Sequence, residues 1–149
     1  YKAIDWRILT LIFGMLAISI AMNKVGLVDT VVSHVMTLSP LLGPLFMLSF
    51  IYLLTSVLTE VVSNNAVAVL VTPIAIGVAQ QLGADPTPFV VAVMFAASAS
   101  FMTPLGYQTN LMVMGPGGYR FTDYLKIGIP MSLVAATVSV GLIPLVWAF

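Results

Sequence analysis

Two long apolar segments of the chain meet at the polar stretch Thr59-Glu60-Val61-Val62-Ser63-Asn64-Asn65. The first segment begins at Leu41, and the second runs from Ala66 to Ala79. Two complete membrane spans would need a turn in water between them, whereas a re-entrant hairpin needs less, because its tip stays inside protein at membrane depth. We therefore favour a re-entrant helical hairpin over residues 41–82 with its tip at 59–65. Two complete spans are the alternative.

The composition indicates that this chain is embedded in a lipid bilayer. Of its 149 residues, 60% are hydrophobic and only 7% are charged, whereas a soluble domain carries roughly a quarter charged residues. The formal net charge is zero, which gives no basic stripe for nucleic acid. The absence of cysteine excludes disulfides, iron–sulfur clusters and thiolate zinc sites. We expect an all-α integral membrane protein with no nucleic-acid partner.

A second polar interruption follows about forty residues after the first. The stretch Thr103-Pro104-Leu105-Gly106-Tyr107-Gln108-Thr109-Asn110 combines Pro and Gly with several polar side chains. It predicts a broken helix over residues 88–118 with the break at 103–110. A break at membrane depth is costly unless the freed backbone groups bind something or line a cavity. An ordinary kink at Pro104 and Gly106 is the alternative.

Paired interruptions of this kind are typical of transport sites. A half-helix that starts at mid-membrane offers unpaired N–H groups to an anion, and one that ends there offers carbonyl oxygens to sodium. Asn, Ser and Thr add neutral oxygens and donors without the cost of a buried charge. Ser63 or Asn64 could instead simply cap the following helix. Glu60 could relay a proton or an ion, face a watery vestibule, or pair with a cation elsewhere.

The rest of the chain divides into shorter segments within one membrane domain, residues 1–149. We expect transmembrane helices at 6–26 and 127–149 and interfacial segments at 28–38 and 119–126. The first residue is Tyr1, and we expect the chain to be a fragment of a longer protein.

The tip stretch resembles the T-E-x-x-S-N-T hairpin tip of the divalent anion/sodium symporters, the solute-carrier group that moves dicarboxylates, citrate or sulfate. The run Phe101-Met102-Thr103-Pro104, ending at Asn110, is similar to the second broken helix of that family. The order of span, hairpin, broken helix and final span matches its C-terminal repeat. The resemblance implies half of an inverted-repeat transporter, with the N-terminal repeat as its partner, and a homodimer.

The resemblance also implies roles for individual residues. The implied sodium ligands are Thr59, Val62, Asn64 and Gly106. The implied substrate-binding residues are Ser63, Asn64, Asn65, Gln108, Thr109 and Asn110. Asn65 stands where the family has a hydroxyl, and the second break lacks the dicarboxylate carriers' T-P-P-N-like sequence, which argues against a dicarboxylate. The runs at residues 104–110 (PLGYQTN) and 115–121 (GPGGYRF) resemble the sulfate-type branch and its bacterial relatives more closely.

We therefore expect sodium-coupled symport of a small divalent anion, sulfate or dicarboxylate, by alternating access, with sodium as the coupling ion and no other cofactor. The expected location is the bacterial inner membrane, as a multi-pass protein. A proton-coupled or antiporting relative carrying citrate, arsenite or sodium is the alternative within transport, with Glu60 as the titrating group. A non-transporting structural subunit is a further alternative. The chain has one histidine and no cysteine, and no span carries a pair of acids, so we do not expect an enzyme.

Overall fold

A computed structural model describes residues 6–37 and 43–149 of the chain. Within these ranges the protein is all-α, as predicted, and contains no strand. Residue 38 of the predicted interfacial helix and residues 41–42 of the predicted hairpin lie outside the described ranges. The helices in chain order are α1 (Trp6–Lys24), α2 (Leu27–Met36), α3 (Pro44–Thr59), α4 (Asn64–Leu82), α5 (Pro86–Ser98), α6 (Gln108–Met114) and α7 (Phe121–Val146).

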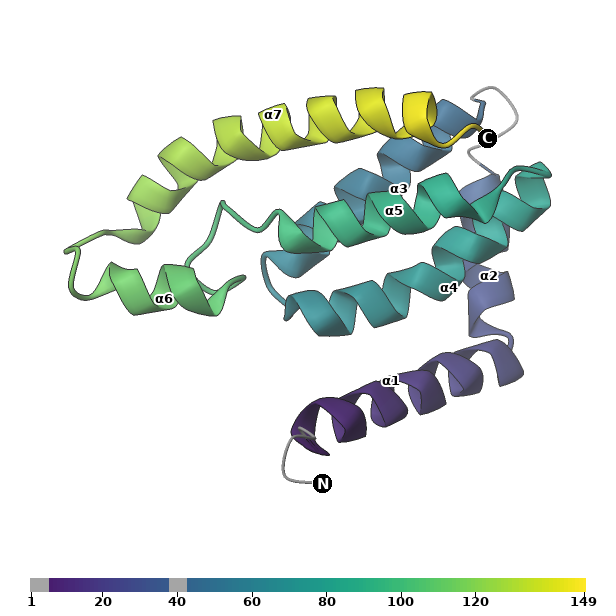
Figure 1. The fold of residues 1–149 in the computed structure, drawn as a ribbon, viewed down its shortest axis with the longest axis horizontal. Helices are drawn as coiled ribbons and strands as arrows, with labels where there is room; N and C mark the ends of the chain where they lie inside the picture. Colours follow the sequence, from purple (N-terminus) through teal and green to yellow (C-terminus); the bar gives the residue numbers. More distant parts are fainter. Residues whose placement is uncertain (1–5, 38–42) are drawn as a thin grey trace.

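The hydrophobic core lies between α3, α4 and α5, which contact one another (Figure 1). Helices α3 and α4 form a hairpin whose turn spans residues 60–63, and α5 returns beside both arms. Small residues of α5 allow this close approach: Ala92 and Ala96 are completely buried, which is expected where helices pack closely in a membrane protein. Helix α2 adds Val28 and Val32 to the core from the side of α4.

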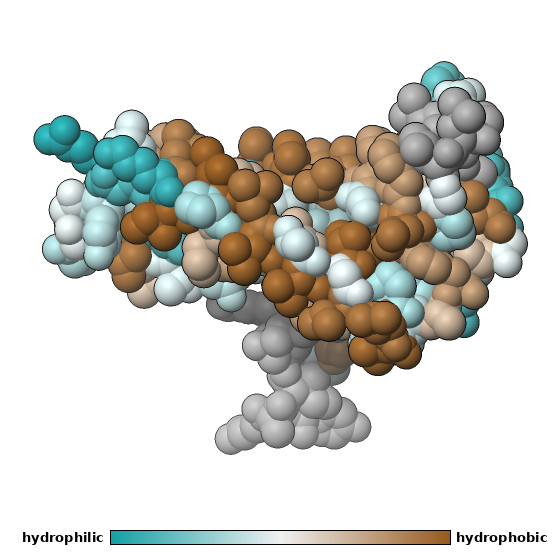
Figure 2. All heavy atoms as spheres, turned by 90° about the horizontal axis from the view of Figure 1, so that it is seen from above, coloured by the Kyte–Doolittle hydropathy of each residue, from teal (hydrophilic) through white to brown (hydrophobic). Residues whose placement is uncertain are grey.

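The hairpin tip and the end of α5 lie together near the middle of the long axis, and α7 runs along much of that axis (Figure 1). Among the described residues, α4 and α7 are long and apolar enough to cross a bilayer, judged by length and composition. Figure 2 shows that one face of the molecule is largely hydrophobic, with hydrophilic residues gathered toward its two ends. In α7 only Gly128 and Ile143 are buried, and its exposed apolar side chains, among them Leu133, Val134 and Leu145, are available to lipid or to another helix.

The break in the second broken helix differs from the prediction. The non-helical segment spans residues 99–107, so it begins at Ala99 instead of Thr103, and Gln108 to Asn110 already belong to α6. We refer to residues 99–107 as the break. It starts early because the backbone N–H groups of residues 101–103 bond to Glu60 instead of continuing the helix. A partner so distant in sequence leaves no local signal at Ala99.

The predicted interfacial segment 119–126 is also wrong as a separate element. Helix α7 is continuous from Phe121 and includes the residues assigned to a separate span from 127. The Asp123 carboxylate accepts a hydrogen bond from the Arg120 N–H at 2.9 Å, which fixes the start of the helix there. The polar side chains of its first turns are at least partly exposed, so their polarity does not oppose helix formation.

Candidate functional site

A cluster of oxygen atoms lies where the hairpin tip meets the break. Thr59 Oγ1, the Gly106 carbonyl and the Ala97 carbonyl lie 2.7, 3.1 and 3.2 Å from one end of the Asn64 side-chain amide. We assign the amide nitrogen to this end, because its two hydrogens can be donated to these oxygens, whereas an amide oxygen would face the two carbonyl acceptors. The Thr59 hydroxyl, which is completely buried, donates to the Ala97 carbonyl at 2.9 Å. The site thus gathers neutral oxygens from α3, α5 and the break.

Three of the four predicted sodium ligands therefore lie together: Thr59, Asn64 and Gly106. Val62 lies in the turn of the tip, where its N–H donates to the Leu58 carbonyl at 2.9 Å, and no described contact brings it to the oxygen cluster. The Ala97 carbonyl joins the cluster without having been predicted, because a backbone oxygen of alanine leaves no signal in a sequence.

Gly106 is the point of closest approach between the break and the hairpin tip. A Cβ at this position would overlap Ser100 Oγ and would lie 2.7 Å from the Thr59 carbonyl oxygen and 3.2 Å from Glu60 Cα. Real Cβ atoms essentially never come within 3.0 Å of a heavy atom of a residue that is not their neighbour in the chain. Only glycine therefore lets the Gly106 carbonyl reach the Asn64 amide while the backbone touches the tip.

A hollow of about 580 Å³ lies beside the oxygen cluster. Five of the six predicted substrate-binding residues line it: Ser63, Asn64, Asn65, Gln108 and Thr109. The other lining residues are Ser98, Leu105, Gly106 and Tyr107. We call this hollow the tip pocket. None of the described residues that line it is charged, and most are exposed. Its polar groups are hydroxyls and amides, which can donate hydrogen bonds to an anion.

Ser63 stands at the N-cap of α4, but its side chain makes no capping hydrogen bond there. The alternative interpretation, in which the Ser63 or Asn64 side chain caps α4, is therefore wrong. The first backbone N–H groups of a helix have no partner within the helix, and the helix dipole is positive at this end. The N-terminus of α4 carries Asn64 and Asn65, both of which line the tip pocket, so this positive end lies at the pocket wall.

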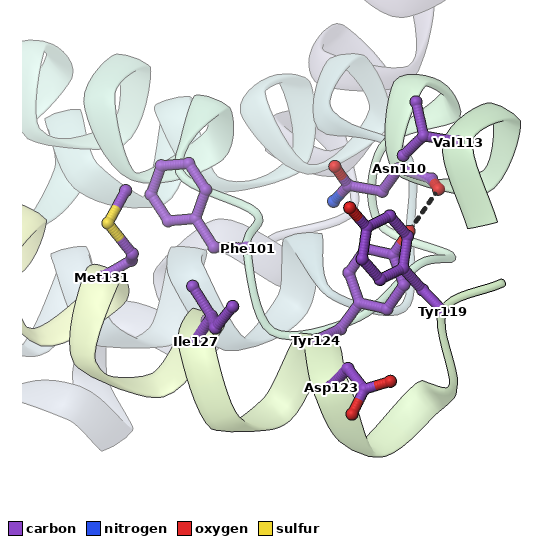
Figure 3. Close-up of a pocket in the computed structure, with 9 residues that line it drawn as sticks. Phe101, Asn110, Val113, Tyr119, Asp123, Tyr124, Ile127 and Met131 are labelled. Carbon is purple, nitrogen blue, oxygen red and sulfur yellow. Dashed lines mark hydrogen bonds between the residues drawn. The ribbon is translucent and has the colours of Figure 1, made fainter. Parts of the chain in front are cut away.

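Asn110 does not line the tip pocket. Its Nδ2 donates to the carbonyls of Ser100 and Thr103, at 3.2 Å each, and its own carbonyl accepts from the Tyr124 hydroxyl at 2.7 Å (Figure 3). It lines instead a separate, mostly apolar hollow of about 520 Å³, formed by Phe101, Tyr119 and residues of α6 and α7. Asn110 thus ties the break to α7 and does not face the other predicted substrate-binding residues.

Comparison with known proteins identifies the family. A profile of the citrate transporter family matches residues 1–94, which include the hairpin and most of α5. An uncharacterized transporter of Synechocystis is 44% identical over 147 residues, 99% of this chain and 24% of that protein. An uncharacterized transporter of Escherichia coli is 40% identical over the whole chain and 24% of its own length.

Relatives with more specific names include sodium/sulfate cotransporters. Sodium/sulfate cotransporter 1 of Chlamydomonas reinhardtii is 32% identical over 133 residues, 89% of this chain and 15% of that protein. The chain thus spans about a quarter or less of the length of these relatives. These three relatives are named as transporters, so the chain matches a family of transporters and not of enzymes, as predicted. The chain belongs to the citrate transporter family.

Proposed function

We propose that the complete protein is a sodium-coupled symporter of a small divalent anion, with sulfate as the first candidate. The observation that carries the proposal is that the oxygen cluster and the tip pocket share two residues, Asn64 and Gly106. An ion in the cluster and an anion in the pocket would therefore be neighbours. The names of the sodium/sulfate cotransporters among the relatives support both ions.

The chemistry of the cluster suits sodium. Sodium is a hard cation, and carbonyl, hydroxyl and amide oxygens are its usual ligands in transporters with broken helices. The Thr59 hydroxyl and the carbonyls of Ala97 and Gly106 supply such oxygens. The Asn64 amide nitrogen faces these oxygens. When sodium binds, the amide would turn and present its oxygen to the ion, so that Asn64 would change its hydrogen bonds.

The tip pocket offers hydrogen-bond donors to an anion, but its described lining carries no full positive charge. This supports coupling of anion binding to sodium binding. The pocket offers hydroxyl and amide donors and the positive end of α4, but no cationic side chain among the described residues. Two opposite unit charges about 4 Å apart attract each other by about 4 kcal/mol where the effective dielectric constant is about 20. A sodium ion in the cluster would supply the missing positive charge. Anion affinity would then depend on sodium, which is the condition for symport.

Alternating access would move this site between the two sides of the membrane. We propose that the long axis of Figure 1 lies near the bilayer normal, so that the α3–α4 hairpin is re-entrant and its tip lies near the midplane. The N-terminal repeat of the complete protein would close the open side of the tip pocket. We also propose a homodimer in the bacterial inner membrane, with the apolar surfaces of α1 and α7 facing lipid or partner helices.

Uptake into proteoliposomes by the complete protein tests the proposal. The anions to compare are labelled sulfate, succinate and citrate, with and without an inward sodium gradient. We expect sodium-dependent sulfate uptake in the wild type. In Asn64→Ala, we expect the sodium concentration for half-maximal uptake to rise by about tenfold or more, since the hydrogen-bonding side chain shared by both sites is lost.

Gln81→Ala is the matched control, because Gln81 is an exposed amide at the other end of the same helix. It should leave the half-saturating sodium concentration unchanged. Uptake that ignores both sodium and Asn64 would overturn the proposal. Sodium-dependent uptake of citrate or succinate, with none of sulfate, would keep the mechanism and replace the substrate.

A further inference from the structure

Glu60 is a buried acid directly at the hairpin tip. Its side chain is only 5% exposed, and an ionised carboxylate at such a position must be compensated by charges or hydrogen bonds. The described partners of its two oxygen atoms are backbone N–H groups of the break. The Phe101 and Met102 N–H groups donate to Glu60 Oε1 at 3.0 Å each, and the Thr103 N–H donates to Oε2 at 2.8 Å.

These three hydrogen bonds satisfy both the backbone N–H groups of the break and the buried carboxylate of Glu60. A non-helical segment inside a membrane protein leaves backbone N–H groups that need partners, and a buried carboxylate needs donors. Hydrogen bonds from backbone N–H groups to a carboxylate are charge-assisted and stronger than those between neutral groups. The carboxylate therefore holds the irregular backbone of the break in one conformation.

Side chains of the break donate further hydrogen bonds to the hairpin tip. Thr103 Oγ1 donates to the Glu60 carbonyl at 2.7 Å and accepts from the Gly106 N–H at 3.1 Å. Ser100 Oγ donates to the Thr59 carbonyl at 3.3 Å. These hydrogen bonds between the two segments therefore have their donors on the break and their acceptors on the tip, and the network reaches Thr59 and Gly106, two residues of the oxygen cluster.

We infer that Glu60 is a positioning residue that clamps the hairpin tip to the break, so that the parts of the cation site contributed by these two segments keep a fixed geometry. Both carboxylate oxygens are committed to this clamp, which accounts for a buried acid at this position. The inference rests on the proposed function for its effect on sodium, but the clamp itself can be measured without transport.

Two measurements on the complete protein test the clamp. The first is amide hydrogen exchange at residues 101–103, and the second is the sodium dependence of sulfate uptake. Glu60→Gln replaces one carboxylate oxygen by an NH₂ group, which cannot accept from a backbone N–H. Thr103→Val keeps the shape of its side chain and removes the two hydrogen bonds of the hydroxyl. Asp85→Asn is the control, since Asp85 is an exposed acid that caps α5 through the Thr87 N–H at 2.7 Å, and Asn caps helices equally well.

For Glu60→Gln we expect exchange at residues 101–103 to be about tenfold faster or more, because one charged hydrogen bond is lost there. The half-saturating sodium concentration should rise by about tenfold, while the maximal uptake rate stays within about threefold of the wild type. Thr103→Val should change both quantities in the same direction by less. Asp85→Asn should change neither. A loss of folded protein alone would lower the maximal rate without moving the half-saturating concentration.

Unchanged exchange at residues 101–103 in both variants overturns the clamp, whatever transport does. Faster exchange with an unchanged half-saturating sodium concentration overturns its positioning role. If the wild type takes up anions without regard to sodium, the proposed function falls, and the exchange measurement alone decides whether the clamp exists.

Discussion

Gly106→Ala is the most direct test of the contact between the break and the hairpin tip. The added methyl group would overlap Ser100 Oγ and would lie 2.7 Å from the Thr59 carbonyl oxygen. The Ser100 side chain can rotate, but the Thr59 backbone oxygen cannot leave without moving the end of α3. Inserting a methyl group into such a contact costs about 1–3 kcal/mol.

The displaced backbone belongs to Thr59, whose hydroxyl is part of the oxygen cluster, so we expect most of this cost to appear in sodium binding. A loss of about 1–3 kcal/mol is a roughly 5- to 150-fold rise in the half-saturating sodium concentration. Sulfate uptake by the complete protein, measured over a range of sodium concentrations, gives this value. The carbonyl group of residue 106 is retained in the variant, so the effect would report packing and not the removal of a ligand atom.

Gly141→Ala provides the matched control. Gly141 lies in α7, and nothing lies within 4 Å of the position of an added Cβ. Alanine is favoured over glycine in a helix by about 0.5–1 kcal/mol, so this variant should be neutral or slightly more stable. Equal sodium dependence in Gly106→Ala and the wild type would refute the close contact on which the account of the cluster rests.

Three further variants test other contacts. In Gly128→Ala, the new methyl group would overlap the Phe101 carbonyl, so α7 should separate from the break and the unfolding temperature in detergent should fall; an unchanged temperature would mean that the two segments are not in contact. In Tyr124→Phe, the hydrogen bond to the Asn110 carbonyl is lost, and we expect about 1 kcal/mol of destabilisation with no effect on sodium dependence; a large shift in sodium dependence would return Asn110 to the binding site. The buried Tyr52 hydroxyl has no hydrogen-bond partner among the described residues, so Tyr52→Phe should raise the unfolding temperature, and a lowered one would reveal a partner of this hydroxyl.

The helices and the two interruptions could be predicted because their signals are local. The polar residues of the tip stand between long apolar segments, and Pro104 and Gly106 mark the second interruption. The meeting of Ser63 to Asn65 with Gln108 and Thr109 was predicted from their family resemblance, and the structure brings these five residues to one pocket. Their role in binding a substrate stays a prediction.

The features that could not be predicted depend on contacts between distant parts of the chain. The break begins at Ala99 because Glu60 binds the N–H groups that follow, and the Ala97 carbonyl enters the oxygen cluster because α5 packs beside the tip. Asn110 was assigned to the substrate together with Gln108 and Thr109, as part of the second interruption. Its amide instead holds the backbone of the break, a role that only the folded chain reveals.

The central claim is that sodium is the coupling ion, and one measurement tests it most directly. The complete wild-type protein in proteoliposomes should accumulate labelled sulfate when an inward sodium gradient is imposed at equal pH on both sides. An inward proton gradient without sodium should drive no accumulation. Accumulation driven by the proton gradient alone, and unaffected by sodium, would contradict the sodium-coupled mechanism and would favour the proton-coupled alternative.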